Sequence, residues 1–481
     1  MKTVLFALAT GLLNLAIVGN VASAAPIVKN TWTVAPGGAV TETKITGGPW
    51  TLGQGPNTVT LPSVGYCKNG VPQKNHGTQT MRPYYFPITI GQGKNLQGYF
   101  DYRPKDSNEA IVAASSKDGG LTWKFQQEAL ELNPGLCPTN ETLTNAASYP
   151  RSATADGLNS ANDAGIGHPY VMDVKRKRFL YTLDRTTNHV NVDGLLANEL
   201  KPTATKPLSP TSPIFKTDVP HTTGLLNPDG IITEVPGSFP RTVMYLQKQR
   251  AADNTNSTAF PANQQCAVPP VGADQVGKKA NHDIVTPRLA TTVDGVNFTD
   301  LGPVTGLNDS KTVSWTQTRY VGPRGTLVQL PRGRYGLFFS GGNCLDADSD
   351  AFHYIGYAES SNLRNWKVIN GIDNPIASVK QITVLSNDVD TVGKQIKIPA
   401  NTPLIATQES FLQRVYSPSA TLFGNNQVSL VFAGYKVKGP ASDFSNYRTI
   451  DRVILKSALP LIGGEGRESF ENERREERFE R

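Results

Sequence analysis

The sequence predicts an all-β fold assembled from repeated strand–turn–strand units. Turn-forming residues are abundant, with 44 Gly and 34 Pro among 481 residues, and long amphipathic helix patterns are hard to find. Strand-like runs recur along the chain, and several of them close on a tight turn that is followed by an aromatic residue. We expect five such units, whose first strands begin near Arg82, His168, Asp229, Arg324 and Tyr416.

The start of the chain predicts a secretory signal peptide over residues 1–24. Lys2 is followed by an apolar run over residues 4–18, and the small residues Ala22-Ser23-Ala24 form an A-x-A cleavage site. No later stretch approaches the roughly 18 apolar residues of a membrane helix. We therefore expect a secreted or periplasmic protein without a membrane span.

The rest of the chain divides into three parts. Residues 25–77 are expected to form a leading segment or a closing strand, and residues 78–460 to form the domain of repeated units. Residues 461–481 form a tail in which charged side chains predominate, which indicates a solvated end rather than a functional module.

The clearest turn lies at residues 116–123, which read Ser-Lys-Asp-Gly-Gly-Leu-Thr-Trp and follow a strand-like run. The side chains of Ser116 and Asp118 can bond the backbone of a turn, and the two glycines supply the positive φ that a tight hairpin needs. Trp123 then starts the next strand and is expected to pack its ring under the turn.

Two later segments are weaker versions of the same turn. Residues 292–298 keep the Asp-Gly turn and an aromatic residue, Phe298. Residues 358–366 follow another strand-like run and close on Trp366, with Asn362 in the position of the Asp. Three turns of one kind indicate a repeated supersecondary unit.

These turns carry a resemblance to known glycosidases. The S-x-D-x-G-x-T-W pattern of residues 116–123 resembles the Asp-box hairpin of sialidases and related β-propellers. Residues 358–366 resemble the A-x-S-x-D-L-x-x-W turn of five-bladed glycosidases such as arabinanases and invertases. The resemblance implies a β-propeller. We expect five blades from the number of units, with a six-bladed, sialidase-like propeller as the alternative.

The charge of the chain and the motifs it lacks exclude several classes of function. The formal net charge of +7 is spread along the chain without Lys/Arg runs, so nucleic-acid binding is not expected. A modest positive field suits an acidic ligand, but an ordinary basic surface explains the same charge more simply. The sequence contains no G-x-S-x-G elbow, phosphate-binding loop, H-E-x-x-H helix or dinucleotide fingerprint.

Cysteine and carboxylate spacing predicts no cofactor. In an exported chain the four cysteines are expected to form two disulfides, and three pairings remain open. They are Cys67, Cys137, Cys266 and Cys344. Residues 346–350 carry alternating Asp residues that could hold a structural calcium ion, but they lack the Gly and the distal Glu of an EF-hand loop.

A propeller places its site on the axis, where the innermost strand of each blade begins. The residues near these positions are polar or charged where an ordinary strand start would be apolar. As candidate catalytic residues we identify Asp163, Asp229, Glu409 and Tyr416. As candidate substrate-binding residues we identify Arg82, His168, Arg319, Arg324 and Arg414.

Two glycosidase chemistries compete for these residues. The sialidase resemblance implies an arginine clamp on a carboxylate, made by Arg82, Arg324 or Arg319, and Arg414, because guanidinium groups match carboxylate geometry. Its nucleophile would be Tyr416, activated by Glu409. The arabinanase and invertase resemblance implies acids on the first three inner strands, where Asp163 and Asp229 lie near suitable places but the first entrance offers Arg82.

The sequence therefore predicts a secreted, monomeric propeller that acts on or binds a carbohydrate, with an acidic glycan as one candidate. The leading hypothesis is a glycoside hydrolase that cleaves its substrate with an acid/base pair or a Tyr/Glu pair. The alternative hypothesis is a non-catalytic propeller that binds a carbohydrate or a protein.

Overall fold

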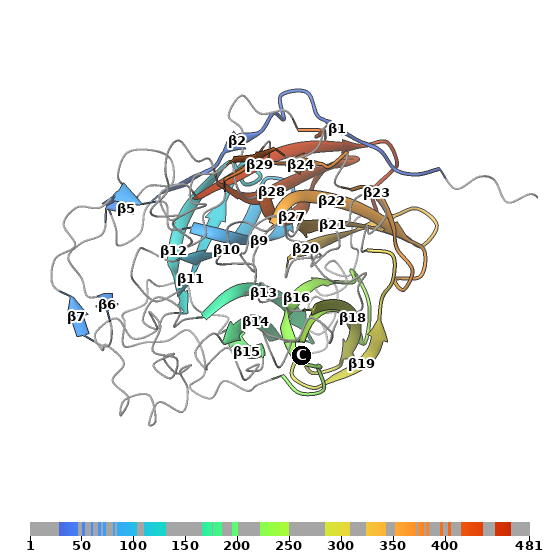
Figure 1. Ribbon diagram of the computed structural model, residues 1–481, viewed down its shortest axis with the longest axis horizontal. Helices are drawn as coiled ribbons and strands as arrows, with labels where there is room; N and C mark the ends of the chain where they lie inside the picture. The colour runs from blue at the N-terminus through green and yellow to red at the C-terminus, as the bar shows by residue number, and fades with distance from the viewer. Residues whose placement is uncertain are drawn as a thin grey trace, which may run out of the picture.

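The structure is a computed structural model in which every described secondary-structure element is a strand (Figure 1). It describes residues 28–46, 84–102, 110–130, 166–175, 177–184, 195–200, 222–249, 284–307, 324–342, 352–371, 374–379, 403–405, 415–435 and 448–462. Short strands outside these stretches are β4 (Thr51–Leu52), β5 (Val59–Thr60), β6 (Tyr66–Lys68), β7 (Val71–Gln73), β8 (Thr80–Met81), β25 (Gln381–Thr383) and β26 (Gln395–Lys397). The described residues contain no helix that could cross a membrane.

The first three large sheets follow one another along the chain, and each begins with the strand that lies innermost. The first sheet contains β9 (Tyr84–Gln92), β10 (Asn95–Tyr102), β11 (Ala110–Ser116), β12 (Thr122–Leu130) and, at its edge, β3 (Lys44–Thr46). The second contains β13 (Ile166–Val174), β14 (Lys177–Asp184) and β15 (Leu195–Leu200). The third contains β16 (Pro228–Glu234), β17 (Arg241–Gln249), β18 (Ile284–Thr292) and β19 (Phe298–Pro303).

The last two large sheets differ in where their edge strands originate. The fourth sheet contains β20 (Gly325–Leu330), β21 (Arg334–Gly342), β22 (Phe352–Ser360), β23 (Lys367–Asn370) and β24 (Ala377–Ser378). The fifth contains β27 (Val415–Gly424), β28 (Gln427–Tyr435), β29 (Arg448–Ser457) and two strands from the start of the chain, β1 (Trp32–Val34) and β2 (Thr41–Glu42).

The first strands of these sheets surround a common axis (Figure 1). β9 contacts β13 and β27, β13 contacts β16, β16 contacts β20, and β20 contacts β27, so that the contacts close into a ring. This is the arrangement of a β-propeller, and each first strand begins within two residues of the position that the sequence predicts. The apolar core lies between neighbouring sheets: one buried cluster joins the first three, a second joins the third and fourth, and a third joins the fourth and fifth.

Side-chain hydroxyl groups connect the first strands around the axis. Four of them accept hydrogen bonds from backbone N–H groups of the neighbouring first strand: Tyr170 from Glu234 (2.6 Å), Thr233 from Leu327 (3.1 Å), Thr326 from Ala420 (3.0 Å) and Ser419 from Thr89 (2.8 Å). Backbone groups that have no ladder partner at an inner edge are thereby satisfied, each bond contributing about 1 kcal/mol.

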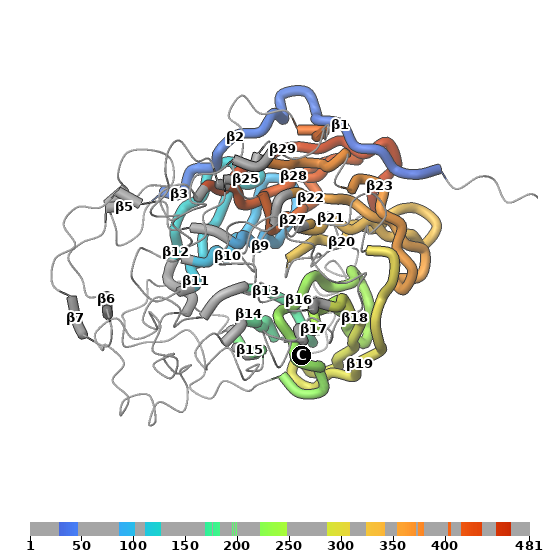
Figure 2. The backbone as a smooth tube through the Cα atoms, in the orientation of Figure 1, coloured from blue at the N-terminus to red at the C-terminus, as the bar shows by residue number. Residues whose placement is uncertain are grey.

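Residues 28–46 form an N-terminal strap that crosses three sheets. β1 pairs with β29, β2 pairs with the same strand, and β3 then runs parallel to β12 of the first sheet. The strap (blue) and β29 (red) therefore lie side by side at the top of the tube view (Figure 2). Trp32 is buried, with its ring centroid 4.9 Å from Phe338 and 5.5 Å from Tyr357 of the fourth sheet.

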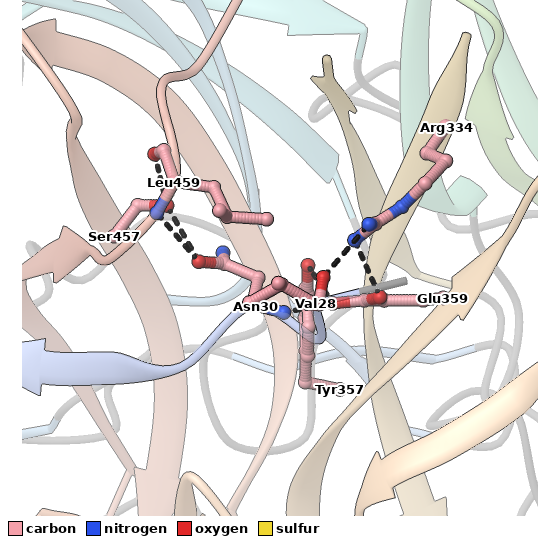
Figure 3. Close-up of polar contacts among 7 residues, drawn as sticks. All are labelled: Val28, Asn30, Arg334, Tyr357, Glu359, Ser457 and Leu459. Atoms are coloured by element: carbon pink, nitrogen blue, oxygen red, sulfur yellow. Dashed lines mark hydrogen bonds and ion pairs between the residues drawn. The ribbon is translucent and has the colours of Figure 1, made fainter. Parts of the chain in front are cut away.

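Asn30 connects the strap to the sheets on both sides of it (Figure 3). Its N–H donates to Oε1 of Glu359 on β22 over 2.8 Å, and its Oδ1 accepts from the Ser457 hydroxyl at 2.9 Å. Glu359 also accepts from Arg334 at 2.8 Å, and both side chains of this ion pair are largely buried. The same guanidinium donates to the carbonyl of Val28.

The three turns singled out in the sequence share one hydrogen-bond pattern. In the first, the Asp118 carboxylate accepts from the Thr122 N–H at 2.9 Å, and the indole of Trp123 donates to the Gly120 carbonyl at 3.0 Å. In the second, Asp294 accepts from the Asn297 N–H at 2.7 Å. In the third, the amide oxygen of Asn362 accepts from the Asn365 N–H at 2.8 Å and so performs the same task.

A Thr-Gly pair runs beside the second and third turns. The carbonyls of Thr223 and Thr305 accept from the N–H groups of Phe298 and Trp366, each at 2.9 Å. The glycine that follows has a φ of +81° in both places, and a Cβ there would lie 1.9 Å from a carbonyl oxygen of the turn. Only glycine fits such a close approach. The repeated Thr-Gly-Leu at residues 223–225 and 305–307 is the sequence signal of this contact.

The second turn predicts a specific acid sensitivity. Burial raises the pKa of the Asp294 carboxyl, but hydrogen bonds from Asn297, Val296 and Thr292 outweigh burial and lower the pKa to about 2. A carboxyl whose folded pKa lies below its unfolded value of about 3.9 stabilises the fold above that value, and the contribution is lost as pH falls towards the folded pKa.

We therefore expect Asp294→Asn to lose less stability than the parent chain between about pH 4 and about pH 2. Thermal melts across this range measure the difference. The reverse exchange, Asn362→Asp, is the matched control and should add acid sensitivity at the third turn. Parallel pH profiles for all three proteins would contradict the assignment.

Candidate functional site

Four of the five first strands share a feature near their starts, a proline preceded by a residue with a polar or aromatic side chain. The pairs are Phe86-Pro87 in β9, His168-Pro169 in β13, Asn227-Pro228 at β16 and Ser417-Pro418 in β27. In each of these four strands, the register against the neighbouring strand shifts at or beside the pair. Bulges of this kind re-aim side chains, and they are over-represented next to active sites.

Three of the residues before proline have a positive φ, a backbone conformation that residues other than glycine rarely adopt. The φ angles of Phe86, Asn227 and Ser417 are 45°, 40° and 57°. Among the described residues, the other non-glycine residues with positive φ lie in tight turns, where this conformation is expected: Lys175, Arg332, Leu363 and Asn426. Phe86 and Ser417 lie inside strands, where this conformation is not expected, and Asn227 lies in the bend that leads into β16. Strain of this kind costs about 1–3 kcal/mol and clusters at active sites and ligand clamps.

Ser417 shows what such a residue offers to a ligand. Its N–H donates to the hydroxyl of Ser340 at 2.7 Å. Its own hydroxyl is buried and has no hydrogen-bond partner among the described residues. A buried polar group without a protein partner is the kind that an ordered water or a ligand satisfies. Beside it, Tyr416 is buried and meets the ring of Phe86 edge-on, with centroids 5.0 Å apart.

Arg324 brings a positive charge to the same end of the ring. Its guanidinium is almost fully buried, at 1% exposure, and donates to the Ile231 carbonyl of β16 over 3.2 Å. The nearby phenol of Tyr170 stays neutral, because burial raises its pKa far above the usual value. Because a guanidinium is always protonated in proteins, Arg324 places a positive charge between the third and fourth sheets.

Of the three predicted catalytic carboxylates, Asp229 lies among the described residues, near the start of β16. It follows Pro228 and is half-buried, and the register of β16 against β17 shifts between Pro228 and Gly230. His168 lies in β13 at the equivalent pair, but its side chain is outside the described residues.

The remaining candidates also lie outside the described residues. They are Arg82, Asp163, Arg319, Glu409 and Arg414, together with residues 346–350 and the side chains of the four cysteines. Within the described stretches, no cluster of His, Cys, Asp or Glu could hold a metal ion.

Of the strained residues before proline, Asn227 is expected from the sequence to open the third unit, whereas Phe86 and Ser417 are not among the candidates. Their signal is visible in retrospect as a repeated X-Pro pair at the head of an apolar strand. The structure brings Arg324, Asp229 and Tyr416 to the same end of the ring as these pairs.

No known protein family and no curated protein matches the sequence. Among solved structures, a GH43_1 enzyme from Xanthomonas citri complexed with xylose is 11% identical, with a TM-score of 0.42 over 82% of this chain and 89% of the other. The catalytic domain of a GH62 α-L-arabinofuranosidase from Coprinopsis cinerea is 9% identical, with a TM-score of 0.40 over 83% and 96%. An N-acetylgalactosamine deacetylase from F. plautii in complex with blood group B trisaccharide is 9% identical, with a TM-score of 0.40 over 84% and 96%.

Proposed function

We propose that this chain is a secreted, five-bladed propeller that binds a glycan where its inner strands begin. Each of the five large sheets is one blade, and the strap completes the fifth. One observation carries the proposal: the residues before proline at the starts of three inner strands, Phe86, Asn227 and Ser417, hold positive φ angles.

Strain at equivalent positions of separate blades supports a shared role for these residues. Glycine adopts positive φ almost without cost, so a sequence selected only for stability would place glycine there. The retained side chains cost free energy in the fold. Contact with a ligand at the axis offsets that cost, and surrounding packing keeps the strained conformation in place.

The resemblance of the three turns to those of glycosidase propellers supports a glycan as the ligand. An acidic glycan is the class to test first, because Arg324 is a buried cation at this end and the net charge of the chain is +7. Arg82, Arg319 and Arg414 complete the proposed clamp.

Hydrolysis is the second candidate function, and Asp229 favours it. Cleavage of a glycosidic bond by the common mechanisms requires two carboxyl groups flanking the bond. Asp163 or Glu409 would have to supply the second. The residues before proline in the first three inner strands are Phe86, His168 and Asn227, none of which is an acid, so binding is the function we place first.

The decisive variant is Ser417→Gly. Glycine suits the φ of 57°, and the hydroxyl it removes has no partner among the described residues. We expect stability to rise by up to about 1 kcal/mol, while affinity for the bound glycan falls about tenfold through loss of one hydrogen bond. A panel of neutral and acidic oligosaccharides identifies the ligand, and calorimetry and thermal melts measure the two effects.

Arg332→Gly is the matched control. Arg332 also has positive φ, at 62°, but it is exposed in the turn between β20 and β21. Its replacement should likewise raise stability and leave affinity unchanged. Unchanged affinity in the Ser417 variant would remove the strained ring from the site. Product release from any oligosaccharide, abolished by Asp229→Asn, would place hydrolysis first.

A further inference from the structure

A polar network in the third sheet contacts the residues on either side of Asn227, one of the three residues before proline with positive φ. The hydroxyl of Tyr245 on β17 accepts from the N–H of Leu226 at 3.2 Å and donates to Oδ1 of Asp300 on β19 at 2.8 Å. Arg288 on β18 holds the same carboxylate through two bonds, at 3.0 and 2.6 Å, and reaches Gln247 at 3.2 Å. The network thus runs across the outer three strands of the sheet.

The network contacts the chain immediately before and immediately after Asn227. Leu226 is bonded directly, through its N–H. Pro228 is the ladder partner of Gln247, the residue that Arg288 contacts. Asn227, with its φ of 40°, lies between these two fixed points.

The chemistry of the groups fixes the direction of each bond. The Arg288 guanidinium lowers the pKa of Asp300, so its carboxylate is ionised and can only accept. Burial raises the pKa of Tyr245 to about 12, so the phenol keeps its proton and donates it to Asp300. The free lone pair of the same oxygen is then left to accept from Leu226. The ion pair of Asp300 and Arg288 therefore orients the Tyr245 oxygen as the acceptor for the N–H of Leu226.

We propose that Tyr245, oriented by Asp300 and Arg288, is a positioning residue that holds Asn227 in its strained conformation for the ligand. This inference rests on the proposed function, because the ligand is the reason to hold Asn227 there. Tyr245 itself is fully buried and acts through the backbone of Leu226.

The test compares Tyr245→Phe with Tyr181→Phe. Tyr181 is equally buried, and its hydroxyl donates to the Gly295 carbonyl at 2.7 Å, at the turn end of the third sheet. Both variants lose one buried hydroxyl and should lose thermal stability, Tyr245→Phe more than Tyr181→Phe because its hydroxyl makes two hydrogen bonds rather than one. Only Tyr245→Phe should accelerate amide hydrogen exchange at Leu226, shift the backbone resonances of Asn227, and weaken glycan binding about tenfold.

Repeating the test in the Asn227→Gly variant shows whether the effect of Tyr245 depends on the side chain of Asn227. With Asn227→Gly already in place, Tyr245→Phe should weaken binding no further, because the side chain that it positions is gone. Equal affinity losses in the two tyrosine variants, or Asn227 resonances unchanged by Tyr245→Phe, would overturn the inference. If the parent chain binds no glycan, the proposed function fails, whereas the exchange rate of Leu226 and the Asn227 resonances still show whether Tyr245 holds this residue.

Discussion

Trp32→Ala is expected to lower the free energy of unfolding by about 3–5 kcal/mol, the usual cost of truncating a buried tryptophan. Trp32 is 5% exposed and belongs to the strap, but its ring lies on Phe338 and Tyr357 of the fourth sheet. Its removal therefore leaves a cavity at the junction of the fourth and fifth sheets. Chemical denaturation measures the loss.

Val34→Ala is the control for this prediction. Val34 lies in the same short strand and keeps the same backbone pairing with β29, but it is 37% exposed. Its truncation should change stability by about 0.5 kcal/mol or less. If the two variants lose the same stability, the strap is held by its backbone alone and the aromatic contact contributes nothing.

Trp123→Ala should have an effect of the same size at the first turn, about 3–5 kcal/mol. Trp123 is 1% exposed, its ring meets Phe100 edge-on at 5.3 Å, and its indole N–H donates to the Gly120 carbonyl. Trp123→Phe keeps most of the packing and loses the hydrogen bond, so it should cost about 1 kcal/mol more than the change in volume alone.

Urea midpoints of the two variants separate packing from hydrogen bonding. A small loss in Trp123→Ala would mean that the turn is stabilised by Asp118 and its backbone partners rather than by the indole. Equal losses in the alanine and phenylalanine variants would assign the whole effect to the indole N–H. The expected order is parent, phenylalanine, alanine.

The strand starts could be predicted because their signals are local. Alternating apolar residues and Gly-rich turns place β9, β13, β16, β20 and β27 from windows of about ten residues. The three turns are equally local, since Asp118, Asp294 and Asn362 bond residues only three or four positions further on.

The axial strain and the network behind it could not be predicted in this way. A Ser-Pro pair is visible in the sequence, but the φ of Ser417 depends on the bulge against β28. Tyr245 and Asp300 lie 55 residues apart, and nothing in their own neighbourhoods indicates that they meet. Such contacts depend on the register of three strands, which no short window contains.

The strap has a consequence for the order in which this protein can fold. Each of the first four sheets is built mainly from strands that follow one another, so it can form as those strands become available. The fifth sheet is different, because the bond between Ser457 and Asn30 joins residues 427 positions apart. A growing chain therefore carries Trp32 without all of its contacts until β29 has been synthesised. During that interval the incomplete ring exposes apolar surface and an unpaired strand edge. Both features promote aggregation and binding by chaperones.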